Sequence, residues 1–139
     1  MALAKSQLKW VYNRTTGYCH ICQKKLAFSN YSACGTRGAW EIEHSRPHAK
    51  GGTDRLNNLF PACISCNRKK GTHTTRTARA KHGKTKAPLS AKKRRSARRE
   101  NAVLGGLAGA AIGAIFGPVG AVAGAAVGAH LGHKKNPDR

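Results

Sequence analysis

Acidic residues are scarce in this sequence. Only 5 of its 139 residues are Asp or Glu, against 26 Lys or Arg, so the formal net charge is +21. So large a surplus cannot be neutralised within the chain and favours a polyanion such as DNA, RNA or an anionic membrane surface. Charge therefore indicates the kind of partner, but it names no activity.

The sequence also lacks the features of a secreted disulfide protein. Its N-terminus, MALAKSQLKWVYNR, has no apolar run long enough for a signal peptide, and its cysteines are odd in number. Four of the five cysteines form two C-x-x-C pairs, a spacing typical of metal ligands. We therefore expect a reducing, cytoplasmic setting and one structural Zn²⁺ bound by Cys19, Cys22, Cys63 and Cys66, with Cys34 left as a free thiol.

Three segments differ sharply in composition. Residues 1–75 hold every Trp, Tyr and Cys and should form the folded domain. Residues 76–100 are rich in Lys and Arg and suggest a basic linker or arm, while residues 101–133 are dominated by Ala and Gly. No charged residue occurs between positions 101 and 131, so the last segment needs an explanation of its own.

Hydrophobic periodicity predicts a small α+β domain. Apolar residues spaced along one helical face before position 15 favour a short N-terminal helix, and the alternation in residues 40–44 predicts a half-buried strand. Residues 45–58 contain Pro and a Gly pair and indicate a loop. A second short strand is expected at 59–60, followed by two helical turns over 64–70 that end at a glycine.

Residues 41–71, EIEHSRPHAKGGTDRLNNLFPACISCNRKKG, combine a carboxylate, an imidazole and two amides over this strand, loop and helix. Phosphodiester hydrolysis needs a base for the water proton and a cation for the charge that develops on the phosphate. His44 is the candidate base, because a neutral imidazole is available near pH 7. The side-chain oxygens of Glu43 and Asn67 are hard ligands suited to Mg²⁺ or Mn²⁺.

This pattern resembles the HNH endonuclease motif of the zinc-bearing, phage and bacterial type, over roughly residues 7–71. The resemblance implies a ββα-metal nuclease with His44 as general base and a catalytic divalent ion on Glu43 and Asn67. It also implies that Asn58 holds the loop by hydrogen bonds so that His44 is aimed correctly. This sequence has Glu43 where Asp is more usual and Asn67 where His can stand.

DNA is the expected substrate, and the basic residues around the motif are the expected phosphate contacts. These are Arg46, Lys50, Arg68, Lys69 and Lys70, which would position DNA without reading its sequence. Five of the other six histidines lack this constellation and are expected to be structural: His48, His73, His82, His130 and His133.

Glycines recur every four residues in the last segment, in two registers. One contains Gly105, Gly109, Gly113 and Gly117, and the other Gly120, Gly124, Gly128 and Gly132. This recurrence places glycines on one helix face, where two backbones can approach closely. With Pro118 between the registers, we expect a helical glycine-zipper hairpin.

The tail resembles glycine-zipper segments of bacterial envelope proteins and secreted toxins. That likeness implies membrane association or self-association, and a nuclease held at a membrane or delivered into a target cell with a delivery or immunity partner. For the tail, the alternative is a soluble self-associating hairpin or a disordered Ala/Gly segment. For the whole chain, the alternatives are a non-catalytic zinc module that binds nucleic acid and a membrane-active peptide fused to a basic domain.

Overall fold

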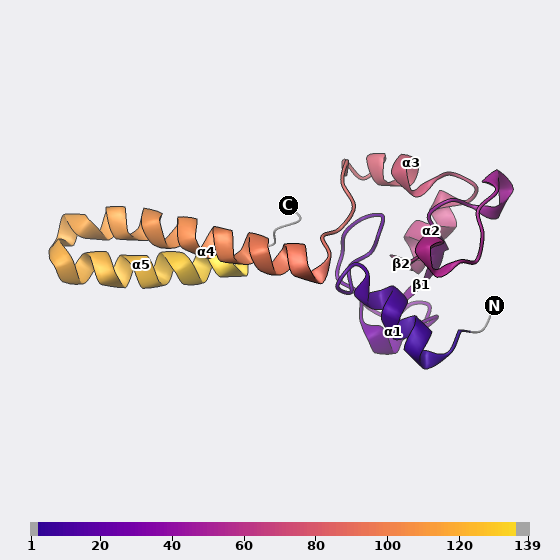
Figure 1. Cartoon of the computed structure of the whole chain (residues 1–139), viewed down its shortest axis with the longest axis horizontal. Coiled ribbons are helices and arrows are strands. Elements are labelled where there is room, and N and C mark those ends of the chain that lie inside the picture. The colour runs from indigo at the N-terminus through magenta and orange to yellow at the C-terminus, as the bar shows by residue number, and fades with distance from the viewer. Residues whose placement is uncertain (1–2, 136–139) are drawn as a thin grey trace. The chain divides into compact units, whose positions relative to one another are not determined.

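The computed structural model of the chain describes residues 3–135 and contains two compact units (Figure 1). The first, Met1–Ala91, is called the N-terminal unit here, and the second, Lys92–Arg139, the C-terminal unit.

A two-stranded antiparallel sheet lies at the centre of the N-terminal unit. Strand β1 (Trp40–His44) pairs with β2 (Leu59–Cys63), with Glu43 opposite Phe60 and His44 opposite Leu59. The predicted first strand is confirmed, whereas the second is longer than expected and includes Pro61. Pro61 cannot donate a ladder hydrogen bond, but its carbonyl accepts one from the His20 amide at 2.8 Å. The pairing therefore carries β2 through to Cys63.

Three helices surround this sheet. Helix α1 (Lys5–Asn13) and helix α2 (Ile64–Lys70) confirm the predicted helices, and α2 follows β2 directly and ends at Gly71. Helix α3 (Thr75–Ala80) begins with a cap in which the Thr74 side chain accepts a hydrogen bond from the Thr77 amide. Because α3 packs within the N-terminal unit, the segment from 76 onward is not a linker along its whole length.

The core is small and centres on Trp40, which is fully buried. Tyr12 of α1 and Tyr31 pack against its ring, with centroid separations of 5.3 and 4.9 Å. The buried core cluster comprises Val11, Cys19, Ile21, Leu26, Trp40, Leu59, Ala62, Cys66 and Ala78. Two of these are predicted zinc ligands, so the metal site is part of the core.

The remaining regular structure of the N-terminal unit is three short 3₁₀ turns. They are η1 (Phe28–Asn30), η2 (His48–Lys50) and η3 (Leu56–Asn58). Both η2 and η3 belong to the predicted loop between β1 and β2. That loop therefore has a defined path from the end of one strand to the start of the other.

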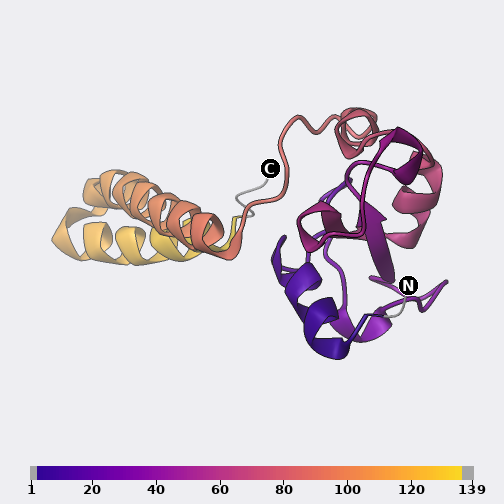
Figure 2. The same cartoon turned by 45° about the vertical axis from the view of Figure 1, so that its right-hand side comes forward.

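The C-terminal unit consists of two long helices. Helix α4 (Ala91–Gly113) and helix α5 (Gly117–Lys134) are joined by the 3₁₀ turn η4 (Ala114–Phe116) and lie side by side in both views (Figures 1 and 2). Their contacts pair glycines of the two helices: Gly105 with Gly128, Gly109 with Gly124, and Gly113 with Gly120. A Cβ atom would overlap the facing backbone at five of these positions, so only glycine permits this approach there: Gly105, Gly109, Gly113, Gly124 and Gly128.

Apolar side chains of the C-terminal unit point outward. Nine of them are at least 60% exposed: Val103, Leu104, Leu107, Ile112, Ile115, Val119, Val122, Val127 and Leu131. Within residues 3–135, no helix has both the length and the apolar character needed to cross a membrane.

Candidate active site

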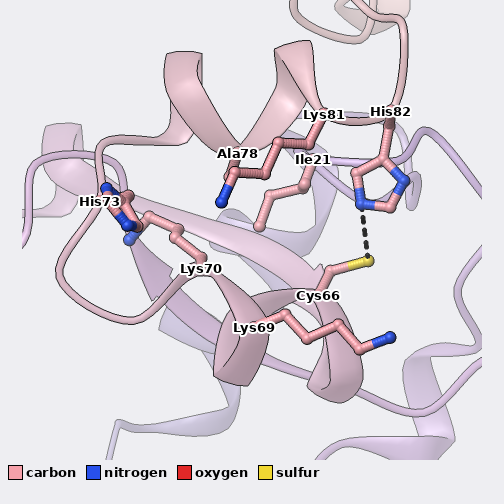
Figure 3. A pocket seen from close by; sticks show the side chains of 8 residues that line it. All are labelled: Ile21, Cys66, Lys69, Lys70, His73, Ala78, Lys81 and His82. Atoms are coloured by element: carbon pink, nitrogen blue, oxygen red, sulfur yellow. Dashed lines mark hydrogen bonds between the residues drawn. The ribbon is translucent and has the colours of Figure 1, made fainter.

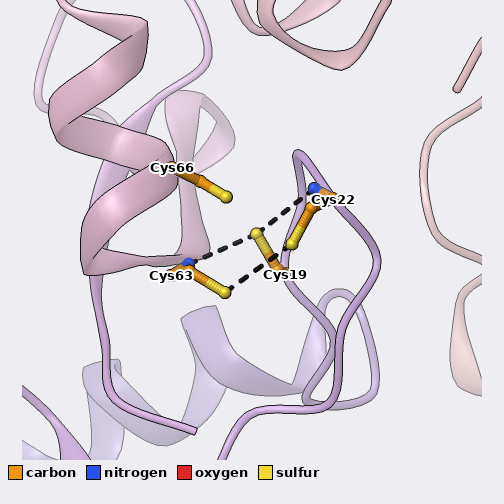
Figure 4. A group of neighbouring side chains, drawn as sticks. All are labelled: Cys19, Cys22, Cys63 and Cys66. Carbon is orange, nitrogen blue, oxygen red and sulfur yellow. Dashed lines mark hydrogen bonds between the residues drawn. The ribbon is translucent and has the colours of Figure 1, made fainter. Parts of the chain in front are cut away.

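Four cysteine side chains converge at the junction of the strands and α2. Cys19 and Cys22 lie on the loop after α1, Cys63 ends β2 and Cys66 lies in the first turn of α2 (Figure 4). Their sulfur atoms all lie within 4.8 Å of one another, and those of Cys22 and Cys63 are 3.7 Å apart. Thiolates bound to a tetrahedral zinc at about 2.3 Å would be separated by about 3.8 Å. This cluster is therefore compatible with structural zinc.

Backbone amides also point at this cluster. The amides of Ile21 and Cys22 donate to the Cys19 sulfur at 3.4 Å each, and the Cys63 amide donates to it at 3.2 Å. Such donors stabilise a thiolate, which is the form that binds metal. Cys34 is exposed and lies outside the cluster.

A buried polar network lies beside the cysteines and is centred on Glu43. This carboxylate is 0% exposed. It accepts a hydrogen bond from His20 Nδ1 at 2.6 Å. Both of its oxygens lie 2.8 Å from Thr75 Oγ1. The ammonium of Lys70 is 3.3 Å from Glu43 Oε2 and donates to the His44 carbonyl at 2.7 Å.

His20 completes this network as a neutral ring. Arg79 Nη2 donates to His20 Nε2 at 2.9 Å, which leaves the ring proton on Nδ1 for Glu43. Burial lowers the pKa of His20 more than the neighbouring carboxylate raises it. Burial alone would raise the pKa of Glu43, but the hydrogen bonds from His20 and Thr75 and the charge of Lys70 outweigh it and lower that pKa. The network therefore pairs a neutral imidazole with an ionised carboxylate.

His44, at the end of β1, faces in a different direction and reaches solvent. Its side chain is 27% exposed, and its Nε2 lies 2.7 Å from Asp54 Oδ1. His48 Nε2 lies 3.0 Å from the same oxygen, and the two imidazole centroids are 4.5 Å apart. Hydrogen bonds from His44 and His48 lower the pKa of the Asp54 carboxyl.

Asn58 holds the loop that carries these groups. Its Oδ1 accepts from the Arg46 amide at 2.8 Å, and its Nδ2 donates to the carbonyls of Arg46 at 2.9 Å and Thr53 at 2.8 Å. The Asn58 carbonyl also accepts from the Ser45 amide at 2.9 Å. One side chain thus ties both ends of the loop together.

Glu43 and Asn67, the predicted ligands of a catalytic Mg²⁺ or Mn²⁺, have separate partners. The Asn67 amide donates to Glu41 Oε1 at 3.0 Å and to the Ile42 carbonyl at 3.3 Å. Glu43 is fully buried and already engaged by donors, including a lysine ammonium. A hard cation needs accessible oxygens and room for its own waters. The surroundings of Glu43 therefore do not fit such an ion in this arrangement.

The predicted phosphate contacts divide into exposed and buried residues. The exposed ones are Arg46, Lys50, Arg68 and Lys69. Lys70, by contrast, is 4% exposed and bonded within the Glu43 network, so it is not positioned to meet DNA.

A cavity of about 170 Å³ opens between α2 and α3 (Figure 3). Among its lining residues are Lys69, Lys81 and His73, and at its other side His82 Nε2 lies 3.9 Å from the sulfur of Cys66. Basic side chains therefore line part of this cavity, together with the apolar side chains of Ile21 and Ala78.

Sequence reasoning assigned no role to Asp54 and treated His48 as structural. A compositional signal was present, since three of the five acidic residues of the chain fall within positions 41–54. The spacing of His44, His48 and Asp54 nevertheless matches no regular period. Only the turns of the loop bring them together, so helix or strand periodicity could not reveal the cluster.

The chain was compared with family models, curated proteins and solved structures. Residues 19–73 match the family model described as HNH endonuclease. This range contains the four clustered cysteines, both strands, the loop between them and α2. No curated protein and no solved structure matches the chain.

Proposed function

We propose that this chain, whose residues 19–73 match the HNH endonuclease family model, is a metal-dependent DNA endonuclease that hydrolyses phosphodiester bonds. The family implies a nucleic-acid substrate, and the net charge of +21 favours the same partner. The observation that carries the proposal is the position of His44, which lies at the exposed end of β1 and is hydrogen-bonded to a carboxylate.

His44 is proposed to act as the general base. In the neutral ring, Nε2–H donates to Asp54, which leaves the lone pair of Nδ1 to accept the proton of an attacking water. The Asp54 carboxylate orients the imidazole and stabilises the imidazolium that forms, as the carboxylate does in hydrolase triads. Asn58 would contribute indirectly, because its hydrogen bonds fix the loop that bears Asp54.

The positively charged groups near His44 are proposed to hold the DNA backbone. Arg46 and Lys50 lie on the loop, and Arg68 and Lys69 lie on the exposed side of α2. Contacts of this kind position phosphate without reading bases. We therefore expect cleavage with weak sequence preference.

The catalytic Mg²⁺ or Mn²⁺ stays a prediction of the family resemblance. Bound near the scissile phosphate, a hard cation would neutralise charge on the phosphate and the leaving oxygen. Because Glu43 does not fit that ion in this arrangement, no step of the mechanism is assigned to Glu43 or Asn67 here. Dependence on a divalent ion is instead part of the test.

Cleavage of supercoiled plasmid in Mg²⁺, in Mn²⁺ and in EDTA tests this function. Changing His44 to Ala should lower the cleavage rate by about 100-fold or more while DNA binding in a gel-shift assay persists. His133→Ala, which removes an exposed histidine of the C-terminal unit, is the matched control and should cleave like wild type. Wild-type protein that binds DNA but cuts it under none of these conditions would instead be a non-catalytic zinc module.

A second proposal concerns the C-terminal unit, which we propose associates with anionic lipid surfaces. Its nine outward apolar side chains have no covering partner in the chain among the described residues, and helices that are apolar all round are normally buried. Exposed basic residues at the start of α4, including Lys92, Lys93 and Arg95, would meet acidic headgroups. A delivery or immunity partner and release into a target cell remain predictions.

Vesicle flotation of the full chain tests this second proposal. The protein should float with vesicles that contain phosphatidylserine and should float less with neutral phosphatidylcholine vesicles. Protein that stays at the bottom of the gradient with both kinds of vesicle would contradict it. The oligomeric state, measured by sedimentation without lipid, would then show whether the apolar faces bind a second copy of the chain.

A further inference from the structure

Three metal-binding side chains meet on the exposed loop beyond the sheet, away from the cysteine cluster. His44 comes from the end of β1, His48 from η2, and Asp54 from the turn that follows. The nearest ligand atoms of these three residues all lie within 4.8 Å of one another. Both imidazoles approach the same carboxylate oxygen, His44 at 2.7 Å and His48 at 3.0 Å.

The loop holds these groups in place before any ligand arrives. Asn58 bonds to the backbone at Arg46 and Thr53, so it closes the loop on both sides of His48. Gly52 lies so close to the Arg46 carbonyl that a Cβ atom would overlap it. Ligands on a preorganised loop lose less conformational entropy on binding than ligands on a free one.

The spacing of the three ligand atoms suits a small cation. Ligands about 2.05 Å from a tetrahedral ion are separated by about 3.3 Å. The two His–Asp separations, 2.7 and 3.0 Å, are hydrogen-bond distances, so an ion would need each histidine to move from Asp54 by only a few tenths of an ångström, and all three ligand atoms lie within 4.8 Å of one another. His48 and Asp54 are 59% and 53% exposed, so neighbouring side chains leave them room to make this adjustment.

The donor set decides which ions would bind. Two imidazole nitrogens and one carboxylate oxygen suit Zn²⁺, Co²⁺, Ni²⁺ or Mn²⁺, whereas Mg²⁺ prefers oxygen ligands. Zinc sites with three protein ligands keep a further position open to water. The exposure of the cluster leaves that position accessible.

We infer that His44, His48 and Asp54 form a second metal centre for a transition-metal ion of the Zn²⁺ class, separate from the four-cysteine site. The ligand atoms are Nε2 of both histidines and a carboxylate oxygen of Asp54. A neutral imidazole has one lone pair. When Nε2 of His44 gives that pair to the metal, Nδ1 carries the proton and cannot act as a base.

Occupation of this centre therefore opposes the base role of His44, and this consequence rests on the proposed function. Micromolar Zn²⁺ added to a Mg²⁺ reaction should suppress cleavage. The metal would act as an inhibitor on the very residue that activates water.

Titration of the full chain with Co²⁺ tests the site without reference to activity. Protein holding one zinc on its cysteines should bind one further Co²⁺, seen by calorimetry and by visible absorption. We expect His48→Asn and Asp54→Asn to lower the affinity for this ion at least tenfold. The control, His73→Asn, removes an exposed histidine of the same unit and should leave binding unchanged. The inference is overturned by the absence of a second equivalent, or by equal binding in all three variants.

The cleavage assay then tests the consequence. In Mg²⁺, added Zn²⁺ should reduce the cleavage rate of wild type at least tenfold, and His48→Asn should resist this inhibition because its His44 is intact. Equal inhibition of both proteins would contradict the link to His44. If wild type fails to cleave in any ion, the proposed function fails, while the Co²⁺ titration still decides whether the metal centre exists.

Discussion

Glu43 connects four parts of the N-terminal unit through one buried carboxylate. It lies on β1 and contacts His20 of the cysteine loop, Lys70 of α2 and Thr75 at the start of α3. Removing one partner of a buried ion pair destabilises a protein, because the other charge is left buried without compensation. The charge of Glu43 is therefore expected to contribute to stability.

Changing Glu43 to Gln should lower the free energy of unfolding by about 3 kcal/mol, since Lys70 would stay buried without its counter-charge. Urea unfolding followed by tryptophan fluorescence measures this loss. Glu41→Gln changes a partly exposed carboxylate on the same strand and should alter stability far less. If Glu43→Gln instead keeps full stability and loses only divalent-dependent cleavage, Glu43 acts as the metal ligand that the family resemblance implies.

The sequence predicted the contacts of some residues and not of others. The cysteines were predictable, because two C-x-x-C pairs specify a metal site by spacing alone. The neighbours of Glu43 were not, because His20, Lys70 and Thr75 come from three distant segments. Their convergence depends on tertiary packing, which no local pattern encodes.

At the scale of elements, the sequence predicted the helices and strands whose own residues show a hydrophobic pattern or an end signal. Strand β1 alternates apolar and polar residues in sequence, and α2 begins within the second C-x-x-C pair and ends at Gly71, so both were found. Helix α3 was missed because its segment is polar and basic. Its buried polar residues, Thr75 and Arg79, bond to Glu43 and His20, which only folding brings close to α3.

The packing of α4 against α5 depends on particular glycines, and the chain offers a matched pair for testing this. A Cβ atom on Gly109 would overlap the Gly124 backbone, whereas one on Gly106 would sit 3.5 Å from Ala129, at ordinary contact distance. Replacing either glycine with Ala should stabilise the helix itself by about 1 kcal/mol, because Ala has the higher helix propensity. The two variants therefore differ chiefly in packing.

Gly109→Ala should destabilise the helix pair by about 1–3 kcal/mol, while Gly106→Ala should leave it unchanged or more stable. Thermal unfolding followed by far-ultraviolet circular dichroism measures both, because α4 and α5 supply most of the helix of the chain. A similar gain in melting temperature for both variants would show that the helices do not approach at Gly109.

At the scale of the whole molecule, the small N-terminal core depends on the cysteine cluster. Cys19 and Cys66 belong to the buried core, and their partners Cys22 and Cys63 join the loop after α1 to the end of β2. A metal that binds only the folded state adds its binding free energy to stability. For a core this small, we expect a zinc bound by these cysteines to decide whether the unit folds.

Changing Cys66 to Ser should release the zinc and unfold the N-terminal unit, with a loss on the order of several kcal/mol. Both tryptophans lie in this unit and Trp40 is fully buried, so fluorescence reports its unfolding, and a colorimetric chelator measures the zinc. Cys34→Ser is the control, because Cys34 is exposed and outside the cluster. It should keep one zinc per chain and the wild-type emission. A folded Cys66→Ser protein without zinc would show that packing alone sustains the unit, and the metal would then need another role.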